Sequence, residues 1–403
     1  MTATMLPPEE YTARVLSGLA PLAPVHLPLA EAHGLVLAED VRAVVPVPPW
    51  TNSAMDGYAV RAADVAAVPV TLPVAGDVPA GAAPDPLAPG TAQRIMTGAM
   101  LPEGADAVVR VEDTDQLSGA RPLPDAVTIR ADVVPGANVR RAGEDVGVDD
   151  MVLRAGTVLK ATALSAAASV GRSTVLAVPR PRVAVVVTGA ELTEAGESLT
   201  VGKIPDSNSA LLAGLITEHG AQLAGVAHSI DTPADLAAAL TAAATDADLI
   251  VTSGGVSVGA FDPFTALASG WGDQATAGIE LTVAKVAMQP GKPQGYGTVR
   301  DGDGRHVPVI GLPGNPVSVL VSFTTIVAPA LARLSGRDAP GGQTAPVPDA
   351  VAPAATARAA VGWSSPRGRR QHVPVRVVAP PQPLPDGVDA EAGRSAVWVA
   401  PSH

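Results

Sequence analysis

The sequence contains no cysteine, few aromatic residues and little positive charge. The absence of cysteine among 403 residues excludes disulfides and thiolate metal sites. Aromatic residues make up 2% of the chain, so a core of this size must be built from alanine, valine and leucine. The formal net charge is −12 and no long basic stripe offsets it. This charge argues against a nucleic-acid partner, because bound phosphates require neutralisation.

Long hydrophobic runs are also scarce. No apolar run is expected to reach the roughly 18 residues of a membrane span. The start from Met1 to Glu10 is acidic and lacks the basic and apolar regions of a signal peptide. The sequence therefore predicts a cytoplasmic protein without a membrane segment. The 40 glycines and 40 prolines stay below the roughly 25–30% typical of low complexity, and so predict many turns and domain junctions.

The first half of the chain is predicted to consist of one domain interrupted by another. Apolar residues four apart predict a helix over residues 8–19. Short β-prone runs, divided by proline and glycine, predict a β-rich insert domain over residues 47–145. Residues 146–179 include an expected helix over 161–170. Together with residues 1–46 they are predicted to form an N-terminal linker domain around the insert.

The second half shows alternating helices and strands. Strands are expected at 183–187, 221–229 and 249–252, and helices at 207–219, 233–244 and after Pro263 and Pro316. This alternation predicts a parallel sheet covered on both faces, a three-layer αβα module over residues 180–337. After a proline-rich linker, residues 345–403 are expected to form a small C-terminal β domain. The predicted fold class is thus multi-domain, α/β plus β.

Three motifs follow predicted strands of this module, where binding loops of parallel sheets gather. The first is Thr188-Gly189-Ala190-Glu191. Glu191 is explained equally well as a functional carboxylate and as an ordinary solvated residue. The second is Ser253-Gly254-Gly255-Val256-Ser257, which offers backbone N–H groups and two hydroxyls to an anion but departs from dinucleotide and P-loop patterns. The third is Pro313-Gly314-Asn315-Pro316, in which Asn315 is a good N-cap and Pro316 suits the first helical position. Capping alone would explain it, but the shared sheet edge favours a ligand site.

Two lysines lie between the second and third motifs. Lys285 and Lys292 are cations in an acidic chain, close in sequence to anion-friendly loops. Phosphate binding and ordinary solvation are both consistent with them.

The segment from Pro48 to Ala59 confines one acid among small residues. Asp56 lies near Asn52 and Ser53, which supply uncharged hydrogen-bonding groups, and before Gly57, which permits a tight turn or a close approach. The simple alternative is an Asp-Gly turn between two strands.

The order of these motifs resembles a known family. The Pro48–Ala59 segment is followed by Arg94–Ala99, by residues 101–109, by Asn138–Asp145 and then by the three strand-end motifs. Over residues 5–337 this order resembles that of the molybdopterin molybdenumtransferases, the enzymes related to the E domain of gephyrin. The resemblance implies an elongated cytoplasmic homodimer, in which the N-terminal linker domain dimerises. It also implies insertion of molybdate into adenylated molybdopterin, with Mg²⁺ required and AMP released.

The resemblance also implies roles for individual residues. The expected catalytic residues are Asp56, Thr97, Asp145 and Glu191, and the expected metal ligands are Glu191 and Asp262. The expected substrate-binding residues are Ser53, Thr188, Gly189, Asp231, Ser253, Gly254, Gly255, Ser257, Lys285, Lys292, Pro313, Asn315 and Pro316. The insert is expected to contribute its residues from the other subunit, so that the site is a cleft at the dimer interface. The adenylyltransferase that makes the adenylated intermediate and the molybdoenzymes are the protein partners that the family suggests.

The end of the chain departs from the family pattern. Ser365 and Arg369 lie in a basic segment where relatives carry donors proposed to hold molybdate, although a basic hairpin would explain the segment equally. After Arg376 the domain is expected to be shortened or altered. Ala260 and Gln289 fall where relatives often carry a charged residue.

Two other functions remain open from the sequence. A molybdopterin adenylyltransferase would share the αβα module, but would not need the insert that carries Asp56. A gephyrin-like scaffold would bind partners without turnover, and the acidic motif positions argue against that.

Overall fold

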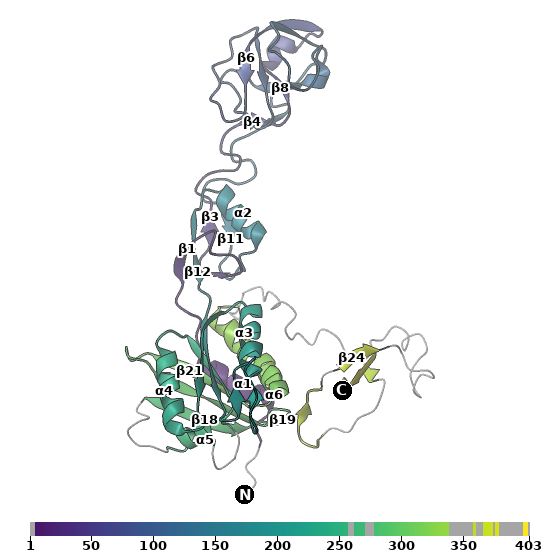
Figure 1. Ribbon diagram of the computed structural model, residues 1–403. Coiled ribbons are helices and arrows are strands. Elements are labelled where there is room, and N and C mark those ends of the chain that lie inside the picture. Colours follow the sequence, from purple (N-terminus) through teal and green to yellow (C-terminus); the bar gives the residue numbers. More distant parts are fainter. Residues whose placement is uncertain are drawn as a thin grey trace.

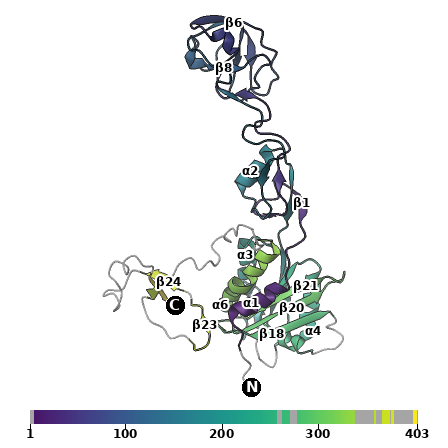
Figure 2. The same cartoon turned by 180° about the vertical axis from the view of Figure 1, so that it is seen from behind.

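The computed structural model describes residues 5–256, 262–270, 278–337, 358–359, 366–373, 375–378 and 398–401. These residues form an elongated molecule in which three bodies follow one another along its length (Figures 1 and 2). A β-rich domain lies at one end, a small stalk lies in the middle, and a larger αβα module lies at the other end. A short C-terminal sheet lies beside the module.

The αβα module contains a six-stranded sheet. Its strand order is β16-β13-β17-β21-β20-β18. The strands are β13 (Arg182–Thr188), β16 (Gln222–Ser229), β17 (Leu249–Ser253), β18 (Ile279–Lys285), β20 (Pro293–Arg300) and β21 (His306–Leu312). The helices are α3 (Asn208–Glu218), α4 (Pro233–Ala244), α5 (Pro263–Ala268), α6 (Pro316–Ser322) and α7 (Ala328–Leu334), with a π-helical turn, η3 (Phe323–Val327), joining the last two. The helices and strands expected from the sequence are present, within a few residues at each end.

The sheet is mixed, which corrects the expectation of a parallel sheet. Strands β16, β13, β17 and β21 are parallel to their neighbours, whereas β20 pairs antiparallel with β21 and with β18. The sequence analysis identified neither β18 nor β20; in β20, Gly295 and Gly297 interrupt the strand pattern. A Cβ on Gly297 would lie 1.9 Å from the carbonyl oxygen of Glu280, so the close pairing of these two strands requires glycine.

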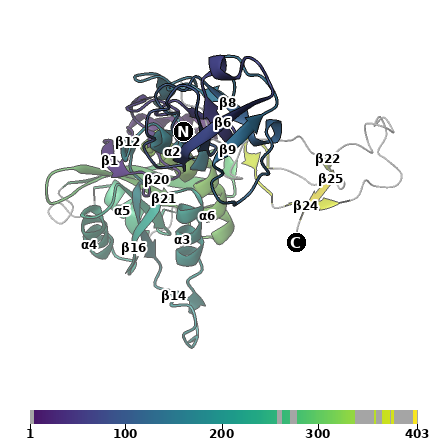
Figure 3. The same ribbon diagram turned by 90° about the horizontal axis from the view of Figure 1, so that it is seen from above.

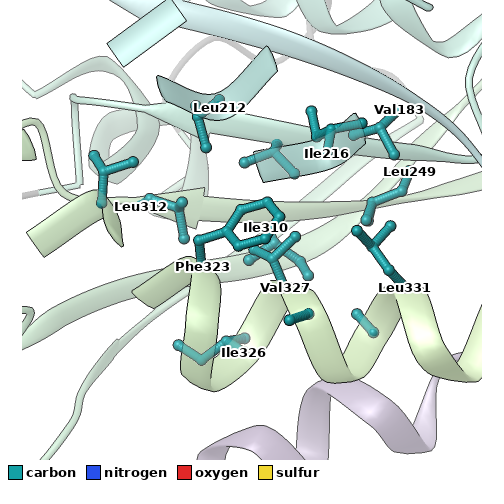
Figure 4. Close-up of a cluster of buried hydrophobic side chains, with 14 of the residues drawn as sticks. Val183, Leu212, Ile216, Leu249, Ile310, Leu312, Phe323, Ile326, Val327 and Leu331 are labelled. Carbon is teal, nitrogen blue, oxygen red and sulfur yellow. The ribbon is translucent and has the colours of Figure 1, made fainter. Parts of the chain in front are cut away.

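Helices cover both faces of this sheet. Alternate residues of β13 face opposite sides: Val183, Val185 and Val187 pack with α3, α6 and α7, whereas Ala184 and Val186 pack with α4 and α5. Figure 4 shows the first of these cores, where Phe323 and Leu331 lie against strand residues such as Ile310. The period of two in β13 matches the pleat of a strand buried on both faces.

The stretch Pro316–Leu334 corrects another expectation. By length and composition this helical stretch is long and apolar enough to cross a membrane, with a mean hydropathy of 1.8, although the sequence suggested no such run. In an 18-residue window of this stretch, 56% is buried, and Val319, Phe323 and Val327 belong to the core of the module. It serves here as a core helix of the αβα module.

The first helix belongs to the module rather than to the stalk. Helix α1 (Pro8–Ser17) buries Tyr11 and Val15 against the same core as α7. The Tyr11 hydroxyl donates to the carbonyl oxygen of Gly295 at 2.9 Å. The assignment of all residues 1–46 to the N-terminal linker domain therefore differs from the structure at its start, and the stalk begins after α1.

The stalk has its own small core. A sheet of order β1-β12-β2 is formed by β1 (Val25–Pro28), β12 (Thr174–Val178) and β2 (Val36–Leu37). Strands β3 (Val41–Arg42) and β11 (Met151–Leu153) pair beside it, and α2 (Ala161–Ser169) covers it. The stalk is therefore built from two chain segments on either side of the β-rich domain.

The β-rich domain contains a five-stranded sheet of order β8-β5-β7-β6-β9. Its strands are β5 (Gly57–Val60), β6 (Val70–Val78), β7 (Ala92–Ile95), β8 (Ala107–Arg110) and β9 (Ala126–Ile129). Two short 3-10 turns, η1 (Ala62–Val65) and η2 (Val111–Asp113), complete it. The pair β4 (Asn52–Ser53) and β10 (Val139–Arg140) connects it toward the stalk.

Beyond the module, the described residues form two small features. Strands β22 (Arg358–Ala359), β25 (Trp398–Pro401) and β24 (Val375–Val378) form a three-stranded sheet. Strand β23 (Arg370–Gln371) pairs in parallel with β19 (Met288–Gln289) of the module. A short arm, β14 (Leu192–Thr193) and β15 (Ile204–Pro205), also leaves the module, and Figure 3 shows it projecting from the edge near α3.

Candidate functional site

The carboxyl ends of the four parallel strands meet at one edge of the αβα sheet. The register pairs Thr188 with Ser229, Val187 with Ser253, and Ser253 with Leu312. A cavity of about 300 Å³ opens at this edge. Its lining includes the predicted residues Thr188, Gly189, Glu191, Asp231, Ser253, Gly254, Gly255, Asp262 and Pro313. The topology thus brings together residues that lie far apart in the sequence.

Gly254 is required where two of these loops approach each other. Its φ is +96°, and a Cβ there would lie 2.3 Å from the carbonyl oxygen of Thr188. Its N–H donates to the carbonyl oxygen of Leu312 at 3.0 Å. Gly254 therefore ties the ends of three neighbouring strands together, which a residue with a side chain would prevent.

Three carboxylates lie at this cavity in different settings. Asp231 accepts a hydrogen bond from the N–H of Ala190 at 2.6 Å and one from the Thr188 hydroxyl at 3.4 Å, so it holds the loop that precedes Glu191. Glu191 and Asp262 line the same cavity. In the part of the chain that the structure describes, no group of three or more His, Cys, Asp or Glu side chains is placed to hold a metal ion.

Other expected binding residues lie apart from the cavity lining. Asn315 caps α6, where its Oδ1 accepts from the N–H groups of Val317 and Ser318 at 3.0 and 3.3 Å, and Pro316 begins that helix. Lys285 is exposed at the end of β18 and Lys292 is half-buried, and neither lines the cavity. Ser257 and Ser365 lie outside the described residues.

The β-rich domain holds Asp56 and Thr97 together. The N–H and the hydroxyl of Thr97 both donate to Asp56 Oδ1 at 2.7 Å, across 41 residues of sequence. The hydrogen bond from the Thr97 hydroxyl is the largest cause that lowers the pKa of the Asp56 carboxyl, and the Thr97 N–H adds to it. Asp56 is therefore a charged, exposed carboxylate in a fixed orientation.

Ser53 and Gly57 shape the segment that carries Asp56. The Ser53 hydroxyl is buried and donates to the carbonyl oxygen of Met55 at 2.5 Å, so its hydrogen-bonding capacity is used within the turn. A Cβ on Gly57 would lie 1.9 Å from the carbonyl oxygen of Val109. Gly57 thus permits β5 and β8 to approach closely, and Asp56 enters the sheet at a fixed point.

A second cavity, of about 600 Å³, opens beside Asp56. Arg94 spans it: its guanidinium forms two hydrogen bonds with Asp77, the Nε–Oδ1 bond at 3.0 Å and the Nη2–Oδ2 bond at 2.5 Å. Its Nη1 also donates to the carbonyl oxygens of Arg121 and Pro122, at 2.9 and 3.2 Å. Arg94 therefore holds the 116–122 loop over the side of the domain that carries Asp56.

Asp145 lies at the junction of the stalk and the β-rich domain. Its N–H donates to the carbonyl oxygen of Val47 at 3.0 Å, and its side chain is exposed. No described contact joins it to Asp56 or to the αβα cavity. Within one chain, the expected catalytic residues therefore lie in separate bodies (Figure 1).

Arg369 reaches the module from the C-terminal segment. Its Nη1 donates to Gln289 Oε1 at 2.7 Å, beside the paired strands β19 and β23. Arg370 forms an ion pair with Glu9 of α1. A segment of residues 366–373, the C-terminal clip, is thus attached to the module between Lys285 and Lys292.

Two residues of the candidate site escaped the sequence analysis. Asn208, at the start of α3, lines the αβα cavity, and Arg94 holds the loop beside Asp56. Asn208 follows Asp206-Ser207, which is a helix-start signal that is explained by capping alone. In the sequence, Arg94 is distinguished only as the first residue of the Arg94–Ala99 motif. Their contacts are long-range, so no local pattern reveals them.

Comparison with known proteins decides the family. Residues 6–171 match the family model described as MoeA N-terminal region (domain I and II), and residues 184–333 match the model described as probable molybdopterin binding domain. Molybdopterin molybdenumtransferase 2 of Mycobacterium tuberculosis H37Rv is 42% identical over 372 residues, covering 90% of this chain and 85% of the relative. The chain belongs to the molybdopterin molybdenumtransferase family.

Other members of the molybdopterin molybdenumtransferase family agree with this assignment. The molybdopterin molybdenumtransferase of Nostoc sp. PCC 7120 is 37% identical over 348 residues, covering 83% of this chain and 76% of that relative. A crystal structure of the molybdopterin biosynthesis MoeA protein from Pyrococcus horikoshii matches with a TM-score of 0.66 and 32% identity, covering 83% of this chain and 81% of that one. The multi-domain fold class and the resemblance noted in the sequence are thereby confirmed.

Proposed function

We propose that this chain acts in molybdenum cofactor biosynthesis by inserting molybdenum from molybdate into molybdopterin that is supplied in adenylated form, with Mg²⁺-dependent release of AMP. Given the family to which the chain belongs, the observation that supports this proposal is the combination of small hydrogen-bonding loops with fixed carboxylates. This combination is found in the strand-end cavity and in the Asp56–Thr97 pair. Cleavage of a phosphoanhydride depends on positioning and on neutralising developing charge, and these groups suit both tasks.

The αβα cavity binds the molybdopterin part in this proposal. Thr188, Gly189, Ser253, Gly254, Gly255 and Pro313 contribute hydroxyl and backbone groups, and Asp231 holds the loop before Glu191. Asn315 and Pro316 present the N-terminus of α6 behind the Pro313-Gly314 loop. Lys285 and Lys292 act from the rim, where their charges attract an anionic substrate without direct contact with the cavity.

Glu191 and Asp262 would hold Mg²⁺. Both carboxylates line the same cavity, and they offer the oxygen ligands that this hard cation prefers. Two protein carboxylates are a normal share for Mg²⁺, which usually keeps several waters and takes further ligands from substrate phosphates. The cation would neutralise charge on the phosphate oxygens. The positions of Glu191 and Asp262 would determine where in the cavity the cation lies.

Asp56, Thr97 and Asp145 complete the site from a second copy of the chain. Within one chain, Asp56 and Thr97 adjoin β5 and β7 of the β-rich domain and Asp145 lies at its junction with the stalk, whereas the αβα module is a separate body (Figure 1). Exposed apolar side chains on and near the stalk support pairing of two copies: Val44, Val45, Val148 and Met151 are 51%, 38%, 62% and 41% exposed. Burial of such side chains is the main driving force for a stable homodimer.

The C-terminal clip supplies an oxyanion-binding group. The hydrogen bond to Gln289 orients the Arg369 guanidinium, which suits a tetrahedral oxyanion such as molybdate. Ser365 precedes the clip and is proposed as a second donor. This arrangement would place molybdate at the seam between the C-terminal segment and the module, near Lys285 and Lys292.

Two alternative functions can be distinguished from this proposal by their reactions. A molybdopterin adenylyltransferase would consume ATP and would not need Asp56. A scaffold without turnover would bind partners but release no AMP. We also propose a cytoplasmic location and contacts with the adenylyltransferase and with molybdoenzymes, because the substrate arrives from one and the product passes to the other.

AMP release from adenylated molybdopterin, with and without Mg²⁺ and molybdate, tests the proposal. Molybdate-stimulated release that requires Mg²⁺ is expected. A mixture of Asp56→Asn and Glu191→Gln chains, refolded or co-expressed into mixed dimers, is expected to recover activity that neither variant has alone, since one site per mixed dimer would be intact. Absence of recovery in verified mixed dimers would contradict a site shared between copies. Absence of release by the wild type would contradict the activity itself.

A further inference from the structure

Asn208 joins two loops of the αβα cavity. It lies at the start of α3 with 6% of its surface exposed. Its Nδ2 donates to Ser253 Oγ at 2.9 Å and to the carbonyl oxygen of Gly314 at 2.7 Å. These partners lie 45 and 106 residues away in sequence. A single side-chain amide thus links the loop after β17 to the loop after β21.

The chemistry of the partners fixes the orientation of this amide. The carbonyl oxygen of Gly314 only accepts hydrogen bonds, so it must face the NH₂ group of Asn208 rather than the oxygen. The second hydrogen of that NH₂ group is directed to Ser253 Oγ, which therefore accepts. A serine hydroxyl has one proton to donate, and among the described residues Ser253 Oγ is found only as the acceptor from Asn208. Ser253 is 1% exposed and lines the cavity, so this proton is available to an acceptor that binds there.

The first turn of α3 is held so that Asn208 keeps its place. Asp206 accepts from the N–H groups of Asn208 and Ser209 at 2.9 and 3.1 Å, and from His228 Nε2 at 2.9 Å. Burial raises the pKa of Asp206, but these hydrogen bonds and that of the Ser209 hydroxyl outweigh it and lower the pKa overall. The charged carboxylate fixes the backbone from which Asn208 projects.

We propose that Asn208 is a positioning residue of the molybdopterin site: it makes the Ser253 hydroxyl a hydrogen-bond donor to an acceptor oxygen of the bound molybdopterin nucleotide. This inference rests on the proposed function of the cavity. Asn208 acts through Ser253 and through the spacing of the two loops. An acceptor oxygen on either the phosphate or the pterin carbonyl of the ligand would satisfy the Ser253 proton.

The module contains a matched control for this arrangement. Gln294 Nε2 donates to Ser322 Oγ at 2.6 Å and to the carbonyl oxygen of Gly291 at 2.8 Å, in a fully buried setting. The same three groups, an amide, a serine hydroxyl and a glycine carbonyl, are therefore joined away from the cavity. Ser322→Ala removes a buried hydrogen bond of the same kind without touching the cavity.

The experiment compares four variants with the wild type: Ser253→Ala, Asn208→Asp, their double variant, and Ser322→Ala. Dissociation constants for adenylated molybdopterin are measured by titration, with melting temperatures in parallel. Ser253→Ala is expected to weaken binding about 10- to 100-fold if the acceptor is a charged phosphate oxygen and about threefold to tenfold if it is the neutral pterin carbonyl, because one hydrogen bond to the ligand is lost. Asn208→Asp is expected to weaken it similarly, since a carboxylate accepts the Ser253 proton instead of leaving it to the ligand. The double variant should be no weaker than either single variant.

Ser322→Ala is expected to lower the melting temperature without changing the dissociation constant. Additive losses in the double variant, or unchanged binding by folded Asn208→Asp protein, would overturn the proposal. If Asn208→Asp does not fold, Asn208→Ser takes its place, with the same criteria. No binding by the wild type would overturn the proposed function together with this inference.

Titration with AMP alone and with molybdopterin alone identifies the acceptor. A loss in Ser253→Ala that is confined to AMP assigns the acceptor to the phosphate. A loss that is confined to molybdopterin assigns it to that half of the ligand. Equal affinity of Ser253→Ala and wild type for both halves and for the adenylated form would overturn the proposal.

Discussion

The two halves of the candidate site hold their functional groups by different means. In the β-rich domain, Asp56 is fixed by two hydrogen bonds from Thr97 while its carboxylate stays exposed. In the αβα module, the cavity is shaped by backbone at four strand ends, where Gly254 fits against Thr188. Substitutions in the first half should therefore lower activity without unfolding the protein. Substitutions in the second half should lower both the activity and the free energy of unfolding.

Asp56→Asn gives the largest effect expected from this difference. Loss of the charge should lower AMP release by at least about 100-fold, because electrostatic groups aimed at a reacting centre contribute on that order. The melting temperature should change little, since Asp56 is exposed. Asp132→Asn, at an exposed carboxylate of the same domain, serves as the control and should keep full activity. A large drop in melting temperature for Asp56→Asn would contradict the comparison.

Gly254→Ala tests the second half. The added Cβ would lie 2.3 Å from the carbonyl oxygen of Thr188 at a φ of +96°, so the free energy of unfolding should fall by about 1–3 kcal/mol. Gly225→Ala is the matched control, because a Cβ there meets nothing within 4 Å. Urea unfolding of the two variants measures the difference. If the two variants were equally stable, the close approach of the Gly254 loop to Thr188 would not be needed for stability, and the prediction would be wrong.

Arg369→Ala tests whether the C-terminal clip contributes to the second half. Losing one charge-assisted hydrogen-bond donor should raise the molybdate concentration for half-maximal AMP release about tenfold. Arg367→Ala removes a neighbouring exposed arginine and should leave that concentration unchanged. If both variants require the same molybdate as the wild type, the oxyanion lies elsewhere.

Thr97→Val gives the smallest effect, which depends on pH. The folded-state pKa of Asp56 is lowered, so its stabilising contribution is present above the unfolded value of about 3.9 and is lost as pH falls through the folded value. Thermal unfolding should show a slightly lower melting temperature for Thr97→Val at pH 7. The difference should shrink as the pH falls below about 4. A difference that grows with acidity would contradict the assigned hydrogen bond.

The sequence predicted the part of the site that depends on local chain order. Thr188, Ser253 and Pro313 follow strands that the alternation of elements identifies, and parallel strands place their ends at one edge. The resemblance to the family named Asp56 and Thr97 as catalytic residues but did not predict the hydrogen bonds between them. Nothing in the local pattern joins two residues 41 apart.

The features that could not be predicted from the sequence depend on contacts between distant residues or on patterns that other residues interrupt. Asn208 bonds to partners 45 and 106 residues away. The antiparallel strand β20 was obscured by two glycines, and Gly297 is required by the close approach of β18. The Pro316–Leu334 stretch contains serines and threonines that interrupt a simple count of apolar residues, although its average hydropathy is high.

The position of α1 has a consequence for synthesis of the chain. Tyr11 bonds to Gly295, 284 residues later, so the helix has no partner until the module has been translated. At roughly 5–20 residues per second, a ribosome needs on the order of tens of seconds to make that interval. The stalk and the β-rich domain are encoded between Tyr11 and Gly295, and all the strands of their sheets are made during this time. Helix α1 is therefore made well before its partners and is among the last helices to be buried, so its apolar face is a natural target for chaperones during translation.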